Sequence, residues 1–207
     1  MTYSYYNSSL QNSSREEQLS IALKAVAVKV PDPVFYAELG DLYLEDMRDL
    51  SKAEYYHKKS AIYTFSNARS LASLAICAQR KNDHDAAVEY RRYASCKSPS
   101  YEGYAQSYFH AALNSNKKDE AIEFLKHRVA TYGKKDSASW ITLSDAYETL
   151  NQDVEARQVI LNALKILPDD SDLLLYMVAH SHSWGYKEQA EEYLDRAKNH
   201  CTSVRWN

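Results

Sequence analysis

Residues 137–170 read SASWITLSDAYETLNQDVEARQVILNALKILPDD, and they contain two helical patterns separated by a short polar turn. The first pattern places four side chains at the i, i+3, i+4 and i+7 spacing of one helix face: Trp140, Leu143, Ser144 and Tyr147. The second repeats this stripe with Ala156, Ile160 and Ala163, and Pro168 ends it because proline cannot continue a helix. The stretch therefore predicts a helical hairpin.

The hairpin pattern recurs along the chain at a period of 34 or 35 residues. Alanine falls at positions 53, 87, 121, 156 and 190, and a second series keeps the same spacing: Leu39, Leu74, Tyr108, Leu143 and Met177. Each helix would be about 14 residues long, or about 21 Å, which is marginal alone in water. Each helix must bury its apolar stripe against its neighbours, so the period predicts a stack of helical hairpins.

The quoted stretch closely resembles the tetratricopeptide repeat consensus. That resemblance implies an all-α fold, a right-handed superhelical α-solenoid of stacked antiparallel helix pairs. It covers residues 33 to about 200, with departures at a few positions that the consensus gives to small or apolar side chains: His57, Ser60, Arg91, Phe109 and Arg128. One extra residue also precedes Ala53.

The period divides the chain into segments. We expect a disordered arm at residues 1–14, which are rich in Ser, Asn and Tyr, and a repeat array from 15 to 207. The array would comprise a half-repeat at 15–32 and five repeats at 33–67, 68–101, 102–136, 137–170 and 171–204.

Composition argues against several other classes of protein. The net charge of −3 is too small to indicate nucleic acid binding. No apolar run is long enough to form a transmembrane helix, so we expect no membrane insertion. Only four glycines occur, too far apart for a Rossmann fingerprint or a P-loop. Three cysteines without a CxxC pair suit free thiols in a reducing compartment, so we expect a cytoplasmic protein. We also expect no cofactor and no catalytic residues.

The resemblance implies a site as well as a fold. In the family, the first helices of the repeats line a concave groove that usually holds a peptide. The matching positions here form the predicted groove: Glu38, Asp41, Glu45, Arg69, Ile76, Arg80, Gln106, His110, Asn114, Ile141, Asp145, Glu148, Asp172, Leu175, Tyr176 and His182. In the family, a clamp of two Lys or Arg and two or three Asn side chains grips the C-terminal carboxylate of a chaperone. The matching positions here hold neither a basic residue nor Asn: Ala37, Asp41, Ser73, Gly103 and Ser107.

Within the predicted groove we expect charged side chains to set association rate and specificity, and four apolar side chains to anchor a partner: Ile76, Ile141, Leu175 and Tyr176. His180 and His182 point to different faces of a helix, so they predict no metal site.

Three functional hypotheses remain open on the sequence. The first is a non-enzymatic scaffold or adaptor that binds a protein or peptide in the groove. The second is a regulatory or substrate-recruiting domain of a larger enzyme of the glycosyltransferase or sulfotransferase type, and the third is a secretion chaperone. Tyr193 and Trp206 lie near an end with no further repeat to cover them, so we also expect either a homodimer through the C-terminal helix or a longer array.

Overall fold

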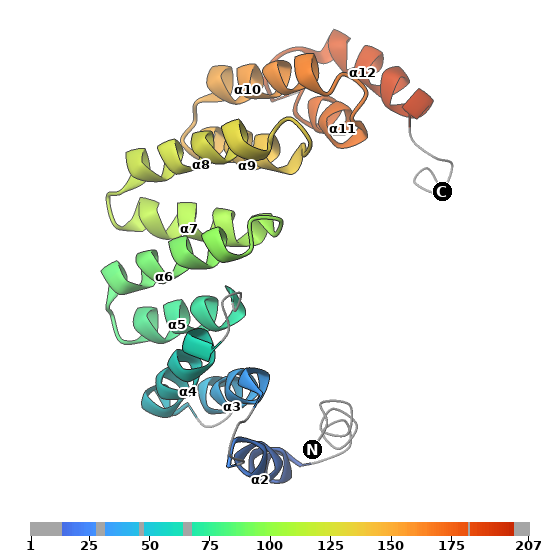
Figure 1. Ribbon diagram of the computed structural model, residues 1–207. Coiled ribbons are helices and arrows are strands. Elements are labelled where there is room, and N and C mark those ends of the chain that lie inside the picture. Colours follow the sequence, from blue (N-terminus) through green and yellow to red (C-terminus); the bar gives the residue numbers. More distant parts are fainter. Residues whose placement is uncertain (1–13, 28–31, 46–47, 64–67, 182, 201–207) are drawn as a thin grey trace. The chain divides into compact units, whose positions relative to one another are not determined.

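Every element in the described part of the chain is an α-helix. The computed structural model describes residues 14–27, 32–45, 48–63, 68–181 and 183–200 (Figure 1). The helices are α2 (Arg15–Val26), α3 (Pro33–Glu45), α4 (Leu50–Tyr63), α5 (Ala68–Arg80), α6 (His84–Lys97), α7 (Glu102–Asn114), α8 (Lys118–Tyr132), α9 (Ala138–Thr149), α10 (Asp153–Ile166), α11 (Ser171–His180) and α12 (Lys187–His200). The predicted all-α fold class is confirmed.

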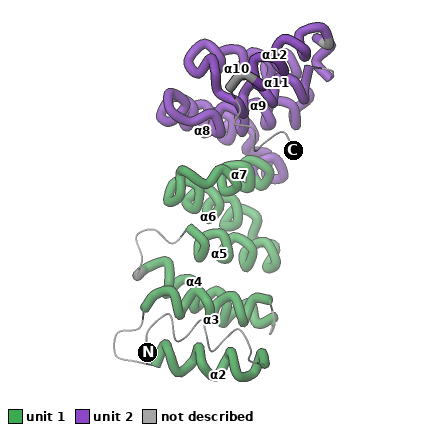
Figure 2. The backbone as a smooth tube through the Cα atoms, turned by 90° about the vertical axis from the view of Figure 1, so that its right-hand side faces the viewer, with its two compact units in different colours: residues 1–111 green, residues 112–207 purple. Residues whose placement is uncertain are grey.

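The chain forms two compact units, residues 1–111 and 112–207, which Figure 2 colours green and purple. In the first unit α2 packs on α3, α3 on α4, α4 on α5 and α5 on α6. In the second unit α8 packs on α9, α9 on α10, α10 on α11 and α11 on α12. The first helices of neighbouring hairpins also touch, α3 with α5 and α9 with α11, and these contacts bring the candidate site together.

The periodic apolar residues form the core. The series that runs through the first helices is at most 4% exposed throughout: Leu39, Leu74, Tyr108, Leu143 and Met177. The alanines of the second helices are also buried at positions 53, 87, 121 and 156, whereas Ala190 is half-buried. The core therefore follows the predicted register. The exact repeat boundaries stay a prediction, and most of the proposed arm lies outside the described residues, although Ser14 caps α2 in a capping box with Glu17.

Two departures from the consensus are explained by local packing in the first hairpin. His57 is fully buried, and its ring lies on Gly40, where an added Cβ would come within 2.7 Å of the imidazole. Ser60 is also fully buried, and its hydroxyl donates to the carbonyl of Pro33 at 2.9 Å. A glycine on one helix thus makes room for a polar ring on the next.

The turns inside the hairpins share a left-handed residue. Positive φ angles recur at intervals of 34 or 35 residues, at Arg48, Asn82, Asn116, Asn151 and Gly185. In each turn the following N–H donates back to a carbonyl near the end of the first helix, for example Asp83 to Ala78 and Lys117 to Ala112, both at 2.9 Å. In the first hairpin Asp49 reaches back to Tyr43, so the extra residue before Ala53 is accommodated in this turn.

One expectation about the C-terminal end is wrong. Tyr193 is only 9% exposed, because it belongs to the core of the second unit, and the Arg196 guanidinium lies 5.7 Å from its ring centre. Tyr193 is therefore covered within the chain itself. Trp206 lies outside the described residues, and a homodimer through the C-terminal helix stays a prediction.

Candidate functional site

In the first unit, α3 and α5 meet through an ion-pair network. Arg69 on α5 donates to Glu38 at 2.9 Å and also pairs with Asp41, both on α3. The Ser73 hydroxyl donates to the other oxygen of Asp41 at 3.2 Å. Burial raises the pKa of Asp41, and the Arg69 charge opposes that rise. Two of the predicted acidic groove residues are thus paired with one predicted basic residue, which offsets one of their two negative charges.

The remaining predicted residues of α3 and α5 include one apolar side chain at the surface. Arg80 donates to the Leu44 carbonyl at 2.8 Å, so this second arginine is also held against α3. Glu45 is exposed, and Ile76 retains 39% of its surface between the two arginines of α5. Ile76 is the predicted apolar anchor that remains open to a partner.

Helix α7 contributes exposed polar side chains, Gln106 and His110, within the first unit. Beside them Ser107 accepts from Arg91 at 3.1 Å, and Arg91 also donates to Gln79 at 2.6 Å. Arg91 occupies a position that the consensus gives to a bulky apolar residue. Its guanidinium forms hydrogen bonds to two first helices, α5 and α7. The predicted Asn114 is exposed, but it belongs to the second unit.

In the second unit, α9 and α11 meet through hydrogen bonds to two carboxylates. The Tyr176 hydroxyl donates to Asp145 Oδ1 at 2.6 Å and lies 3.4 Å from Glu148 Oε2. His180 Nδ1 lies 2.7 Å from Glu148 Oε1. Burial raises the pKa of the Tyr176 hydroxyl, and its bond to Asp145 adds to that rise. Tyr176 is thus a hydrogen-bond donor as well as an apolar surface.

Three rings continue this cluster along α11 and the turn after it. Tyr176 and His180 stack with their centres 4.1 Å apart at 14°, and Trp184 lies 5.4 Å from His180. Neither His180 nor Trp184 is among the predicted groove residues. The spacing of the three aromatic residues, i, i+4 and i+8, could have indicated one face, but Trp184 lies beyond the end of α11.

The other predicted residues of the second unit are placed differently. Ile141 and Leu175, like Tyr176, are partly buried against the core, and their role as anchors stays a prediction. Asp172 is exposed in the first turn of α11, and His182 lies outside the described residues. In the described part of the chain no cluster of three or more His, Cys, Asp or Glu side chains is arranged to hold a metal ion. No described helix has both the length and the apolar character needed to cross a membrane.

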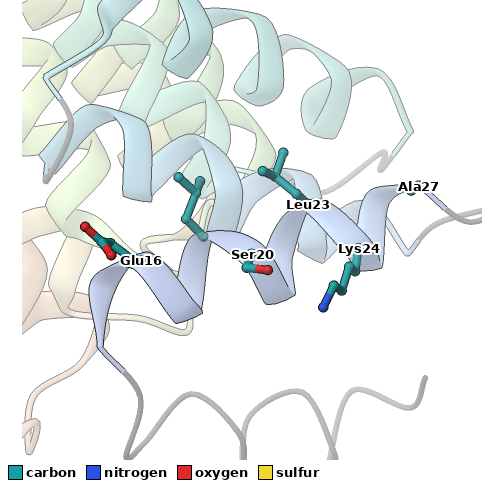
Figure 3. Close-up of a pocket in the computed structure, with 6 residues that line it drawn as sticks. Glu16, Ser20, Leu23, Lys24 and Ala27 are labelled. Atoms are coloured by element: carbon teal, nitrogen blue, oxygen red, sulfur yellow. The ribbon is translucent and has the colours of Figure 1, made fainter.

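A separate hollow of about 410 Å³ lies along α2 (Figure 3). It is lined by that helix and the residue after it: Glu16, Leu19, Ser20, Leu23, Lys24 and Ala27. None of the predicted groove residues borders it. The hollow is therefore not part of the surface formed by the first helices.

No protein-family model and no curated protein sequence matches the chain. Solved structures do match it. The C-terminal part of a TPR repeat-containing protein from Cytophaga hutchinsonii aligns over 97% of this chain and 79% of that chain, with 16% identity and a TM-score of 0.57. PilF of Pseudomonas aeruginosa aligns over 98% and 92%, with 16% identity and a TM-score of 0.55.

A third structure is YrrB, described as a TPR protein with an unusual peptide-binding site; it covers 84% of this chain and 88% of its own, with 16% identity and a TM-score of 0.51. The chain has the tetratricopeptide repeat fold. At this identity the likeness shows the architecture alone, so the function of this tetratricopeptide repeat chain has to be argued from its own side chains.

Proposed function

We propose that this tetratricopeptide repeat chain is a non-enzymatic scaffold that binds a segment of a partner protein along its first helices. The observation that carries this is the same in both units: polar side chains of consecutive first helices meet at the surface. Arg69 joins α5 to α3, and Tyr176 joins α11 to α9. A segment lying across these helices would contact more than one hairpin at once. The peptide-binding site in the description of YrrB supports this use of the fold.

The two units would contribute differently to binding. In the first unit Glu38 and Asp41 are paired with Arg69, so Ile76 offers apolar contact in a nearly neutral surrounding. In the second unit α9 and α11 carry carboxylates and no lysine or arginine, so the same face is acidic. Charges of this kind raise association rates and set specificity, whereas apolar contacts slow dissociation.

We also place this scaffold in the cytoplasm. Cys77 and Cys96 have free thiols, and Cys77 is buried, with the pKa of its thiol raised by that burial. Unpaired thiols are the usual state in a reducing compartment.

Site-specific photo-crosslinking in cells tests where the partner lies. A benzophenone amino acid would replace Ile76 on α5 or Ala179 on α11, which hold the same repeat position, two residues after Leu74 and Met177. The matched controls are exposed positions on second helices: Tyr93 on α6 and Val154 on α10, which are 47% and 81% exposed. The crosslinker would be placed in the full-length chain, and the partner in each adduct would be identified by mass spectrometry.

We expect a discrete protein adduct from Ile76 or Ala179, and at most weak labelling from Tyr93 and Val154. The reverse pattern, with the strong adduct on the second helices, would show that the partner binds elsewhere and would refute the proposal. Equal labelling at all four positions would also refute it, because that result describes non-specific encounter.

A further inference from the structure

The two pairs of first helices hold an acid and a donor at equivalent repeat positions. The buried residues set the equivalence: Leu39 on α3 corresponds to Leu143 on α9, and Leu74 on α5 to Met177 on α11. Two residues after the first members lie Asp41 and Asp145. One residue before the second members lie Ser73 and Tyr176, and each donates to its aspartate, at 3.2 and 2.6 Å. The two sites therefore share one geometry around the carboxylate.

They differ in the cation and in the second acid, because the position of Glu38, one residue before Leu39, holds Thr142 before Leu143. In the first unit Arg69, five residues before Leu74, bridges Glu38 and Asp41. The position five residues before Met177 holds Asp172, an acid instead of an arginine. The second unit therefore has the acceptor of this ion pair without the arginine that would complete it.

Cations on neighbouring helices do not fill the place. Arg157 on α10 donates to Gln189 at 2.9 Å and lies over the Tyr186 ring. On α12, Arg196 donates to the Pro168 carbonyl at 2.7 Å, and Lys198 pairs with Asp195. In the described part of the chain, neither Asp145 nor Glu148 forms an ion pair with a lysine or arginine. Their partners are the hydroxyl of Tyr176 and the ring of His180.

The aromatic side of the site supplies a second observation. The stacked Tyr176 and His180 rings lie directly beside the carboxylates that they bond. Trp184 packs against both rings, is only 8% exposed, and its indole N–H has no hydrogen-bond partner among the described residues. A flat cation reaching the carboxylates would have the stacked Tyr176 and His180 rings beside it.

We propose that Asp145 receives an arginine side chain of the partner segment, as Asp41 receives Arg69 in the first unit, and that Glu148, three residues further along α9, provides the second acceptor. A guanidinium fits this place because it bonds two acceptors at once and stacks on aromatic faces, which an ammonium does less well. The inference rests on the proposed function, since it names the side chain by which a bound segment would be recognised. The first unit supplies its own arginine, and the second takes one from the partner.

The test uses the intact chain and defined probes. The ¹⁵N-labelled protein at pH 7 would be titrated with N-acetyl-arginine amide, and separately with N-acetyl-citrulline amide, which has the same shape without the charge. We expect saturable shifts at Tyr176, at His180 and at the Trp184 indole N–H with arginine, and little or no shift with citrulline. Equal shifts with both probes would overturn the proposal, as would equal shifts with N-acetyl-lysine amide.

Two variants make the test specific to this site. Asp145→Asn keeps an acceptor for Tyr176 while removing the charge, and it should weaken arginine binding by about tenfold or more, which is about 1.4 kcal/mol. Asp172→Arg should supply the missing arginine within the chain, so it should abolish the shifts and raise the melting temperature. Its control is Asp195→Arg on α12, which makes the same change in net charge and should leave the shifts unchanged.

If Asp172→Arg binds the arginine probe as the unchanged protein does, the equivalence between the two units does not hold and the proposal fails. That failure is separate from the crosslinking result. Adducts at Ala179 without arginine binding would leave the scaffold function standing and remove only this recognition site. Arginine binding without such adducts would support the site while refuting the proposed position of the partner.

Discussion

At a position where a tetratricopeptide repeat usually has a bulky apolar residue, the first hairpin buries the imidazole of His57. Neither ring nitrogen forms a hydrogen bond, although Nε2 lies 3.3 Å from Asp41 Oδ1. Burial, with a smaller contribution from the Arg69 charge, lowers the pKa of His57 to about 4. The ring is therefore neutral in the folded protein at pH 7.

The consequence at the residue scale is a loss of stability in mild acid. An unfolded histidine has a pKa of about 6.5, so between pH 6.5 and 4 the unfolded chain binds a proton that folded His57 does not. The free energy of unfolding should fall as the pH drops through that window, by about 3 kcal/mol in all. Urea unfolding followed by circular dichroism at pH 7, 6, 5 and 4.5 measures it.

The matched variant is His57→Leu, because Leu125 occupies the equivalent position of another hairpin. The variant should lose less stability over the same pH range, since it has no proton to bind there. Asp41, whose pKa burial raises, works in the opposite direction at the acid end of the window and is present in both proteins. Identical pH slopes for the two proteins would show that His57 is not the group responsible.

At the scale of the elements, the left-handed turn residues decide how easily each hairpin forms. Asparagine tolerates positive φ better than most residues, and it occupies the turns at Asn82, Asn116 and Asn151. Arg48 adopts φ of 52° in the first hairpin without that advantage. Arg48→Gly should therefore stabilise the protein, by about 0.5–1 kcal/mol, which thermal unfolding would detect as a higher melting temperature.

The reciprocal change lies in the third hairpin. Asn116→Ala should cost about 1 kcal/mol, whereas Asn116→Gly should be close to neutral, because only the alanine has a Cβ that opposes the left-handed conformation. If Arg48→Gly lowers the melting temperature, or if both Asn116 variants behave alike, backbone strain does not limit these turns.

At the scale of the whole molecule, the division into two compact units leads us to expect that a core substitution destabilises one unit and not the whole chain. Each hairpin packs on its immediate neighbours, so a cavity should weaken mainly the unit that contains it. Leu39 and Leu174 are both fully buried, one in each unit. Replacing either by alanine should cost about 2–5 kcal/mol locally.

Hydrogen exchange resolved by mass spectrometry separates the two responses. Leu39→Ala should accelerate exchange in α3, α4 and α5 while α10–α12 keep their protection, and Leu174→Ala should do the opposite. The two variants serve as controls for each other. A uniform loss of protection across both units in either variant would mean that the chain unfolds as one cooperative body.

The amino-acid sequence alone was sufficient to predict the helical hairpins, the order of the elements and the core register. The reason is that apolar spacing within a helix and the period between hairpins are both local patterns, and each hairpin packs only on its neighbours. Leu39, Leu74, Tyr108, Leu143 and Met177 were identified in this way, and all are buried. The sixteen residues of the predicted groove were selected by the same register, and their role in partner binding stays a prediction.

The tertiary structure decided which side chains are paired and which are open. Arg69 and Asp41 are 28 residues apart, and His180 and Glu148 are 32 apart, so their contacts depend on how two helices stack and where each side chain points. The same holds for His57 on Gly40, for Tyr193 in the core and for Ile141 and Leu175 against it. Periodicity assigns a residue to a face, but only packing across helices determines whether its charge is already matched or remains available to a partner.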